Sequence, residues 1–554
     1  MISRISVENR STNNLYERNK DLGNNNPSFK SSGAWSLALQ CMQECEKNPM
    51  VNVAVIDMLS AILPRTIVES TTNWFAGFEA FRRESSGLIV NCLIPSFITM
   101  GIAKLLNGSI MPKGTNLSSC WADNSLIQRA SDIYKNSTAN DKILDSLKEI
   151  LGNIEGSEGK NPLVIFKNAL TPEELEAYSK KLKALTSADI KDKELHKTIK
   201  EITNEIVKKT HVYENIKLGG IDKKVNASNV GTLLEDSVKY FREFLKSDAD
   251  INEFAKKAKK LVVAKSALGL AVILPLAISM QYINRWITGK VSGVKGAPIY
   301  DDFGKQDSVQ DKKSTEGLFK QKVISIASML GVSLLSMMKM PNWGMLQFKG
   351  IFPRMDQARI ISTATFCSRM AAADDKNELA EATIRDLATF SSLYFLGDYA
   401  AKAAATLLEK KTGIQLLNET KSLDENANVV KRIWHWVKHT SLKSSEEVVS
   451  KTAQSLRGAT PNKEQAAKIE SELKRAINLR SACQATNLGV SLLLLGIVIP
   501  IFTRKNTEKK HAEAVKLAHK NSSTQTDKDK PATTPLNVEY TNLTAGFRAD
   551  KRQR

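Results

Sequence analysis

Two pairs of opposite charges are the residues of this chain best spaced for chemistry. In each pair a glutamate precedes an arginine by four positions, so both side chains share one helix face, one turn before an apolar run. Buried at membrane depth, such pairs would line a polar path or bind a lipid headgroup. Exposed at the membrane surface, they would only anchor a helix end, contributing about 0.3–0.5 kcal/mol each. With the acidic residue that follows each arginine, the candidate paired charges are Glu79, Arg83, Glu84, Glu381, Arg385 and Asp386.

A second set of polar residues closes the two most apolar runs. Cations at the C-terminal end of an apolar helix complement the helix dipole and reach phosphate headgroups. We therefore predict ordinary anchoring to anionic lipid headgroups by Arg285, Thr288, Lys290, Arg504, Thr507 and Lys509.

The apolar runs predict the elements that position these residues. Ser266–Ile283 and Ala485–Thr503 carry no charge, and basic residues flank both runs. Each is about 18 residues long, which is enough for a helix to cross a hydrocarbon core of roughly 30 Å. The sequence therefore predicts two strong membrane helices.

Three further apolar segments are weaker candidates. Leu88–Ala103 is uncharged but contains an asparagine and a proline. Val323–Met338 is short for a span, so a re-entrant or packed helix fits it equally well. Val51–Leu63 is too short to span alone, and we expect Pro64 to end it. Two to four apolar helices are predicted in all.

Composition divides the chain further. Between the first apolar segments and the first strong run, the sequence reads as water-compatible helices, one of them starting at Thr171 with a capping box closed by Glu174. The predicted segments are 1–33 (disordered), 34–106 (first-half helices, with a candidate span at 88–106), 107–260 (soluble helical insertion), 261–290 (first strong membrane helix), 291–320 (Gly-rich charged connector), 321–411 (second-half helices, with an apolar segment at 323–338), 412–484 (polar amphipathic helices), 485–503 (second strong membrane helix) and 504–554 (basic disordered tail).

The net charge of +20 limits the choice of partners. The lysines concentrate beside the apolar runs, and no recognition helix, zinc finger or RNA-binding signature accompanies them. We expect anionic lipid headgroups as partners, with a protein partner or a second copy as a further hypothesis, and no nucleic acid. Six scattered cysteines indicate a reducing compartment. The polar N-terminus predicts no cleaved signal peptide, and the basic tail is expected on the cytoplasmic side of a membrane.

The sequence contains no recognisable catalytic or metal-binding motif. His435 and His439 share a helix face, but neither a carboxylate nor a cysteine lies beside them in sequence, so an amphipathic surface helix is preferred to a metal site. No phosphate-binding loop, nucleophile elbow or zinc-protease motif occurs. We predict a non-enzymatic protein without cofactor or metal, and the motifs assign it to no named family.

Three short patterns recur in the same order in the two ends of the chain. Pro64-Arg65 matches Pro353-Arg354, the hexapeptide at 79–84 matches that at 381–386, and the R-x-x-T-x-K pattern at 285–290 matches that at 504–509. Each match alone is weak, but their common order suggests an internal duplication, with the soluble segment inserted in the first half.

The sequence thus predicts an all-α, membrane-associated helical protein with a soluble helical insertion and, as a hypothesis, an internal duplication. A structural, scaffolding or interaction role with lipid-binding basic flanks is the first functional expectation. The alternative is a small transporter or channel of two halves with the Glu/Arg pairs at its centre. A transporter needs those pairs buried beside a polar cavity, whereas a scaffold leaves them in water at the interface. A soluble bundle with apolar core helices is a third possibility.

Overall fold

The structure is a computed structural model of the whole chain. The 1–33 segment, nearly all of the tail and most of the 291–320 connector, for which disorder or a loop was predicted, lie outside the described residues. The described residues are 49–71, 74–156, 170–187, 190–210, 214–219, 225–292, 317–337, 346–348, 353–374, 376–419, 427–445, 447–448, 451–452 and 463–502, together with residues 42, 45, 505 and 509.

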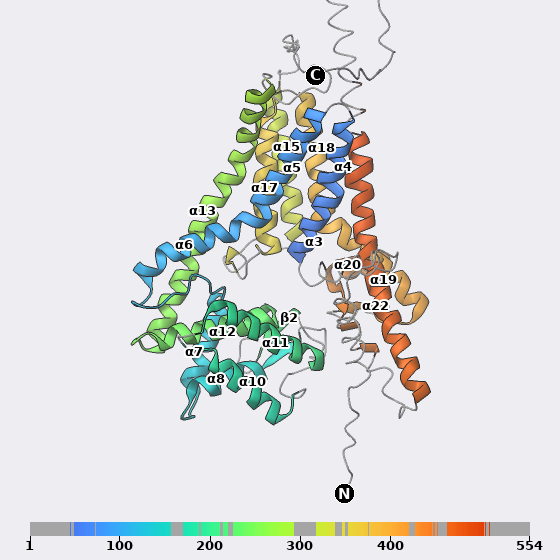
Figure 1. The fold of residues 1–554 in the computed structure, drawn as a ribbon. Helices are drawn as coiled ribbons and strands as arrows, with labels where there is room; N and C mark the ends of the chain where they lie inside the picture. The colour runs from blue at the N-terminus through green and yellow to red at the C-terminus, as the bar shows by residue number, and fades with distance from the viewer. Residues whose placement is uncertain are drawn as a thin grey trace, which may run out of the picture.

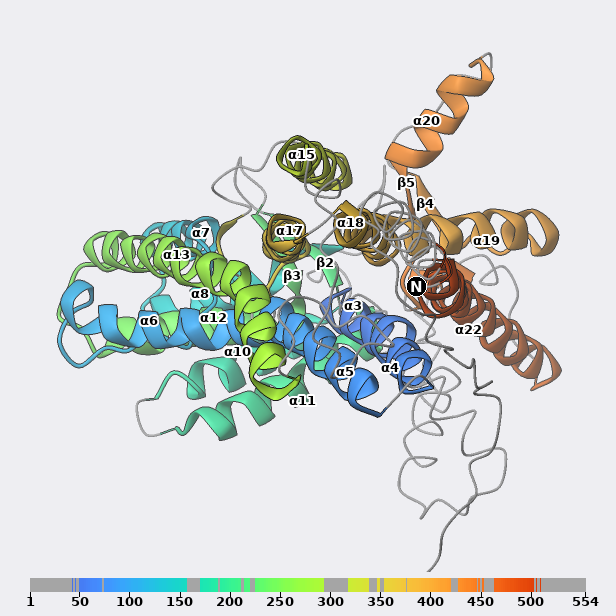
Figure 2. The same ribbon diagram turned by 90° about the horizontal axis from the view of Figure 1, so that it is seen from above.

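The fold is all-α, as predicted, and its main body is a bundle of long helices (Figure 1). Seen from above, α17 and α18 occupy the middle of the bundle, between α15 on one side and α3, α4 and α5 on the other (Figure 2). The elements of the bundle, with η marking a π-helical segment, are α3 (Pro49–Ile56), η1 (Asp57–Ile62), α4 (Leu63–Ser70), α5 (Trp74–Leu88), η2 (Ile89–Leu93), α6 (Ile94–Ile110), α13 (Ile251–Ser292), α15 (Leu318–Met337), α17 (Met355–Ala372), α18 (Lys376–Ser391), η3 (Ser392–Leu396), α19 (Gly397–Thr412), α22 (Lys463–Ser491) and η4 (Leu492–Val498).

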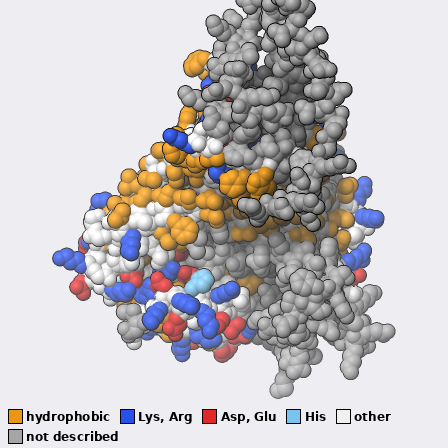
Figure 3. Space-filling model, turned by 45° about the horizontal axis from the view of Figure 1, so that its top comes forward, with side chains coloured by type: hydrophobic (Ala, Val, Ile, Leu, Met, Phe, Trp, Pro, Cys, Tyr) orange, Lys and Arg blue, Asp and Glu red, His pale blue; other side chains and the backbone are white. Residues whose placement is uncertain are grey.

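Five helices of the described chain are long and apolar enough to cross a membrane, one more than the upper limit of the prediction. Both strong runs are among them, inside α13 and across α22 and η4. A space-filling view shows apolar side chains gathered in a band, below which acidic and basic side chains mix (Figure 3). This pattern is compatible with a membrane protein. The five segments are Met50–Ser70, Gly77–Ile110, Ile251–Val291, Leu318–Met337 and Ser471–Phe502.

The prediction that Pro64 ends the first apolar helix is wrong. The helix continues through Pro64 because the turn before it widens into η1, which ends two residues before the proline. In the same way η2 ends two residues before Pro95 and η4 ends two residues before Pro500. A proline deprives the carbonyl four residues earlier of its usual donor and pushes it aside, and a wider π turn accommodates that distortion. The three prolines therefore lie within helices that are long and apolar enough to span a membrane.

The insertion between α6 and α13 forms a separate domain below the bundle (Figure 1). Its capping box is confirmed: the Thr171 hydroxyl accepts from the Glu174 backbone N at 3.2 Å, and the Glu174 carboxylate accepts from the Thr171 backbone N at 3.1 Å. The antiparallel sheet β1-β2-β3 was not predicted. The elements are α7 (Asn124–Asn136), α8 (Lys142–Gly152), β1 (Ile154–Gly156), α10 (Pro172–Ala184), α11 (Asp192–Thr210), β2 (Glu214–Leu218), β3 (Val225–Asn229) and α12 (Val230–Leu245).

Buried polar contacts join this domain to the start of α13. Lys265 of α13 donates from Nζ to the Cys120 carbonyl at 2.6 Å and lies 5.0 Å from the centre of the Trp121 ring. Asp236 of α12 accepts from the Trp121 backbone N at 2.8 Å, and burial raises the pKa of Asp236 to about 7. The helix α13 itself begins at Ile251, so it carries the last residues of the predicted insertion directly into the bundle.

A smaller insertion lies between α19 and α22. The strands β4 (Leu417–Glu419) and β5 (Thr440–Leu442) pair antiparallel and flank the helix α20 (Val429–His439). In the view from above, α15 and α17 are seen end-on, whereas α20 is seen along its length and projects away from the bundle (Figure 2).

Candidate functional site

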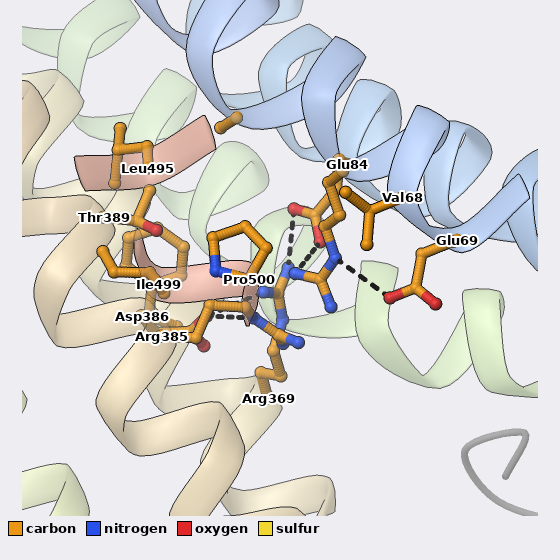
Figure 4. Close-up of a pocket in the computed structure, with 13 residues that line it drawn as sticks. Val68, Glu69, Glu84, Arg369, Arg385, Asp386, Thr389, Leu495, Ile499 and Pro500 are labelled. Atoms are coloured by element: carbon orange, nitrogen blue, oxygen red, sulfur yellow. Dashed lines mark hydrogen bonds and ion pairs between the residues drawn. The ribbon is translucent and has the colours of Figure 1, made fainter. Parts of the chain in front are cut away.

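A pocket lies where α4, α5, α17, α18 and η4 meet, inside the layer formed by the apolar helices (Figure 4). The space between its walls amounts to about 580 Å³, including the part at its mouth that is open to the outside. One wall is apolar and includes Leu495, Ile499 and Pro500 of the last span. The others carry three arginines and three carboxylates, the charged cluster, consisting of Arg65, Glu69, Glu84, Arg369, Arg385 and Asp386.

Arg369 of α17 stands at the centre of the charged cluster. Its Nη1 lies 2.7 Å from Asp386 Oδ1 and its Nη2 lies 3.6 Å from Glu84 Oε2, so one guanidinium links carboxylates from two helices. Glu84 also accepts from Arg65 Nη1 at 2.9 Å through its other oxygen. Arg65 Nε in turn lies 3.9 Å from Glu69 Oε1. Four helices are thereby connected through charged side chains.

Of the two predicted Glu/Arg pairs, one forms as expected, beside the charged cluster. Arg385 Nη1 lies 3.8 Å from Glu381 Oε1, and Arg385 Nε lies 3.3 Å from Asp386 Oδ1. In the other pair the partners differ. Glu79 accepts from the Thr288 hydroxyl at 2.8 Å, and Arg83 Nε lies 4.0 Å from Glu84 Oε1.

Protein covers most of the surface of these charged side chains. The side chains of the charged cluster keep at most 16% of their surface exposed, and Asp386 keeps 1%. An exposed salt bridge at a helix end, the alternative to a buried site, therefore does not describe them. Three opposite pairs make the lining electrically neutral, which reduces the cost of holding charges at this depth. Among the described atoms, Asp386 Oδ2 and Arg369 Nε are buried without a hydrogen-bond partner. Such atoms are costly unless something else binds them.

Half of the charged cluster was missed from the sequence. Arg65 and Glu69 have the four-residue spacing used to find the other pairs, so that signal was available. Arg369 has no acidic residue three or four positions away, and its partner Asp386 lies 17 positions on, in the next helix. Only the bundle brings those two together.

Two of the predicted headgroup anchors turn towards protein instead. Arg285 pairs with Asp374 and, at 2.5 Å from Nη1, with Glu378 Oε1 at the start of α18. Thr288 is buried and accepts from Arg82 Nη2 at 2.9 Å. Both side chains therefore have protein partners on neighbouring helices, and their role as headgroup anchors stays a prediction.

The remaining anchors keep their status as predictions. Lys290 and Lys509 are exposed. Arg504 and Thr507 lie outside the described residues.

Metal chemistry finds no support in the described part of the chain, where no three His, Cys, Asp or Glu side chains gather in a way that could hold an ion. His435 instead lies 3.6 Å from Glu419 Oε1, with its ring 5.2 Å from that of His439. Comparison with known protein families, curated proteins and solved structures finds no match to this chain.

Proposed function

We propose that this protein is a membrane transporter or channel of two related halves, in which protons or small ions pass the charged cluster. The observation that carries the proposal is the pocket lined by three arginines and three carboxylates among helices apolar enough to span a membrane. Ionisable residues at such depth are expensive to keep, and in membrane proteins they mark ion paths and proton relays. The proposal assigns the chain no catalytic reaction.

Helix boundaries support the two related halves. Glu79 and Glu381 are 302 positions apart, and the ends of α4 and α17 and the ends of α6 and α19 have the same separation. The π segments η2 and η3 fall within one position of it. In this register Arg83 and Glu84 correspond to Arg385 and Asp386.

Packing supports the same correspondence. α6 packs on α13 in the first half, and α19 packs on α22 in the second. Across the halves, α13 of the first half packs on α17 of the second. The corresponding contact in the other direction is also present: η4, which continues α22, the counterpart of α13, packs on η1 and α4, the counterparts of α17. The latter contact is close: a Cβ on Gly496 of η4 would lie 3.1 Å from Pro64 Cγ. Reciprocal contacts of this kind are expected when two halves pack about a pseudo-axis.

One of the three sequence matches does not fit this register. Pro64 and Pro353 are 289 positions apart, and Pro64 lies inside a continuous helix whereas Pro353 precedes the start of α17. We therefore omit that match from the proposed duplication. The R-x-x-T-x-K match is 219 positions apart, which is consistent with insertions of different length at 111–250 and 413–462.

The charges of the cluster and their positions indicate which ions the site would pass. Glu84 and Asp386 are equivalent in the proposed halves, and both lie against the single guanidinium of Arg369. A proton or a small ion that binds one carboxylate would weaken its ion pair and release the guanidinium to the other. Such an exchange gives the charged cluster two states, which is what a passage step requires.

Ion flux into proteoliposomes tests the proposed function. Vesicles containing the protein should take up H⁺ or K⁺ faster than protein-free vesicles. Asp386→Asn should remove most of that excess, because it discharges the most buried carboxylate of the pocket. The matched control is Asp374→Asn, which changes an exposed carboxylate outside the pocket and should leave the flux unchanged. Equal flux with and without protein, or an unaffected Asp386→Asn variant, would reject the proposal.

A scaffolding role is the second candidate, favoured by one observation. The inserted domain has a hydrophobic core distinct from those of the bundle, built from α7, α8, α10, α11, α12, the three-stranded sheet and the first part of α13. Such a domain offers a surface outside the apolar layer to which a partner could bind. Absence of ion flux, together with binding of a protein partner to this domain, would favour the scaffolding role.

A further inference from the structure

We infer that α20 is an interfacial helix that lies on the membrane surface and binds anionic lipid. The inference concerns a surface remote from the charged cluster and does not depend on ion passage. Its occupant is the headgroup and upper acyl layer of the membrane that holds the bundle.

The sequence of α20 divides cleanly around its axis. At 100° per residue, one arc holds only apolar side chains, and the opposite arc holds Lys431, Arg432, His435, Lys438 and His439. No acidic residue occurs in α20. An apolar arc with tryptophan facing a basic arc is the composition of helices that lie in the interface of anionic membranes.

The apolar arc is left uncovered by the rest of the described chain. Four of its side chains keep between 58% and 74% of their surface exposed, and we call them the apolar arc of α20: Val429, Val430, Ile433 and Trp434. Four large apolar side chains in one short stretch are too many to be read as scattered surface residues. Something outside the described chain covers them.

The C-terminal part of α20 is fixed to the bundle. Lys402 of α19 donates to the Trp436 carbonyl at 2.9 Å and lies 4.6 Å from the centre of its ring, while Trp436 Nε1 donates to Thr406 Oγ1 at 3.0 Å. At the other end the Asn428 side chain caps the helix by accepting from the Lys431 backbone N at 2.9 Å. The helix is therefore held in a set direction.

That direction selects lipid over a protein partner. α15 and α17 are seen end-on in the view in which α20 is seen along its length, so α20 runs across the direction of these two helices (Figure 2). It does so at the height where α3 begins, at the end of the apolar layer (Figure 1). A helix that runs across the spanning direction at the end of the apolar layer would lie along the membrane surface. Its lysines and arginine complement anionic headgroups there.

Site-directed fluorescence on the reconstituted full-length protein tests the inference. The six natural cysteines are replaced, and an environment-sensitive fluorophore is attached at Val430→Cys in the apolar arc. The matched control is Lys431→Cys, the next residue, which is exposed on the basic arc. In vesicles containing phosphatidylglycerol, the label at 430 should be blue-shifted, quenched by brominated acyl chains and protected from aqueous iodide. The label at 431 should be open to iodide, and the contrast should weaken in pure phosphatidylcholine.

Two outcomes would overturn the inference. Equal iodide quenching at both positions would place the apolar arc in water. Protection at 430 that follows protein density and ignores lipid composition would identify a second copy as the occupant. Because a cysteine-free variant can fail to fold, hydrogen exchange of α20 in the unmodified protein provides a second measurement. Exchange should slow in phosphatidylglycerol nanodiscs relative to detergent, and an unchanged rate would reject the inference.

Discussion

Replacing Arg369 by glutamine is expected to destabilise the bundle by about 3–5 kcal/mol, the cost of removing one partner of a buried ion pair. The guanidinium lies 2.7 Å from Asp386 and 3.6 Å from Glu84, and the substitution leaves both carboxylates without their shared cation. Thermal unfolding in detergent micelles measures the loss as a lowered Tm.

Two further variants control this experiment. Arg475→Gln removes an arginine that pairs with Glu472 at 3.6 Å but keeps 54% of its surface exposed, so its effect should stay within about 1 kcal/mol. Adding Asp386→Asn to Arg369→Gln should recover part of the loss, because one uncompensated charge disappears. If Arg369→Gln is as mild as Arg475→Gln, the charged cluster is not buried as described.

The second large effect is expected from an arginine placed on the outer face of α13. Val272 lies in the middle of the run predicted to span the membrane, and it keeps 49% of its surface exposed in the bundle. If that surface meets lipid, Val272→Arg should cost about 2.5–3.5 kcal/mol. If it meets water, the same change should have almost no effect. The yield of folded protein in the membrane fraction and its unfolding in bilayers measure the difference.

Leu245→Arg is the matched control for this prediction. Leu245 ends α12 in the inserted domain and keeps 54% of its surface exposed, which is similar to Val272. The two side chains are therefore similarly exposed, but one lies in the candidate span and the other in the inserted domain. An equally mild result at both sites would show that the apolar face of α13 does not face lipid, and the bundle would then be a soluble one.

The strong spans could be read from the sequence because they are local. Ser266–Ile283 and Ala485–Thr503 are uncharged runs, and α13 and the α22–η4 helix contain them. The first span was missed because Pro64 was read as a helix end, whereas a π turn absorbs it. The sheet of the inserted domain was missed because β1 is three residues long and its partner lies about sixty residues away. Short strands of this kind depend on tertiary pairing, which leaves little pattern in the sequence.

The charged cluster could be predicted only in part, for a related reason. Spacing along one helix reveals pairs such as Glu381 and Arg385, because neighbours four residues apart face the same way. It cannot reveal that Arg369 reaches Glu84, since those residues lie on helices far apart in the chain. The two functional expectations nevertheless differ in where they place these charges. A transporter needs them buried beside a polar cavity, and a scaffold leaves them in water. The observed burial favours the transporter.

Access of water to the pocket tests the central claim most directly. Thr389 lines the pocket beside the charged cluster, and a cysteine at this position, in a background without natural cysteines, reports on access (Figure 4). In proteoliposomes Thr389→Cys should react with a small charged thiol reagent, whereas Val272→Cys on the exposed apolar surface of α13, which is expected to face lipid, should not. Reaction at Thr389→Cys is the result expected of a polar path inside a membrane protein. A thiol at 389 that stays unmodified from both sides of the membrane, yet reacts after denaturation, would contradict it.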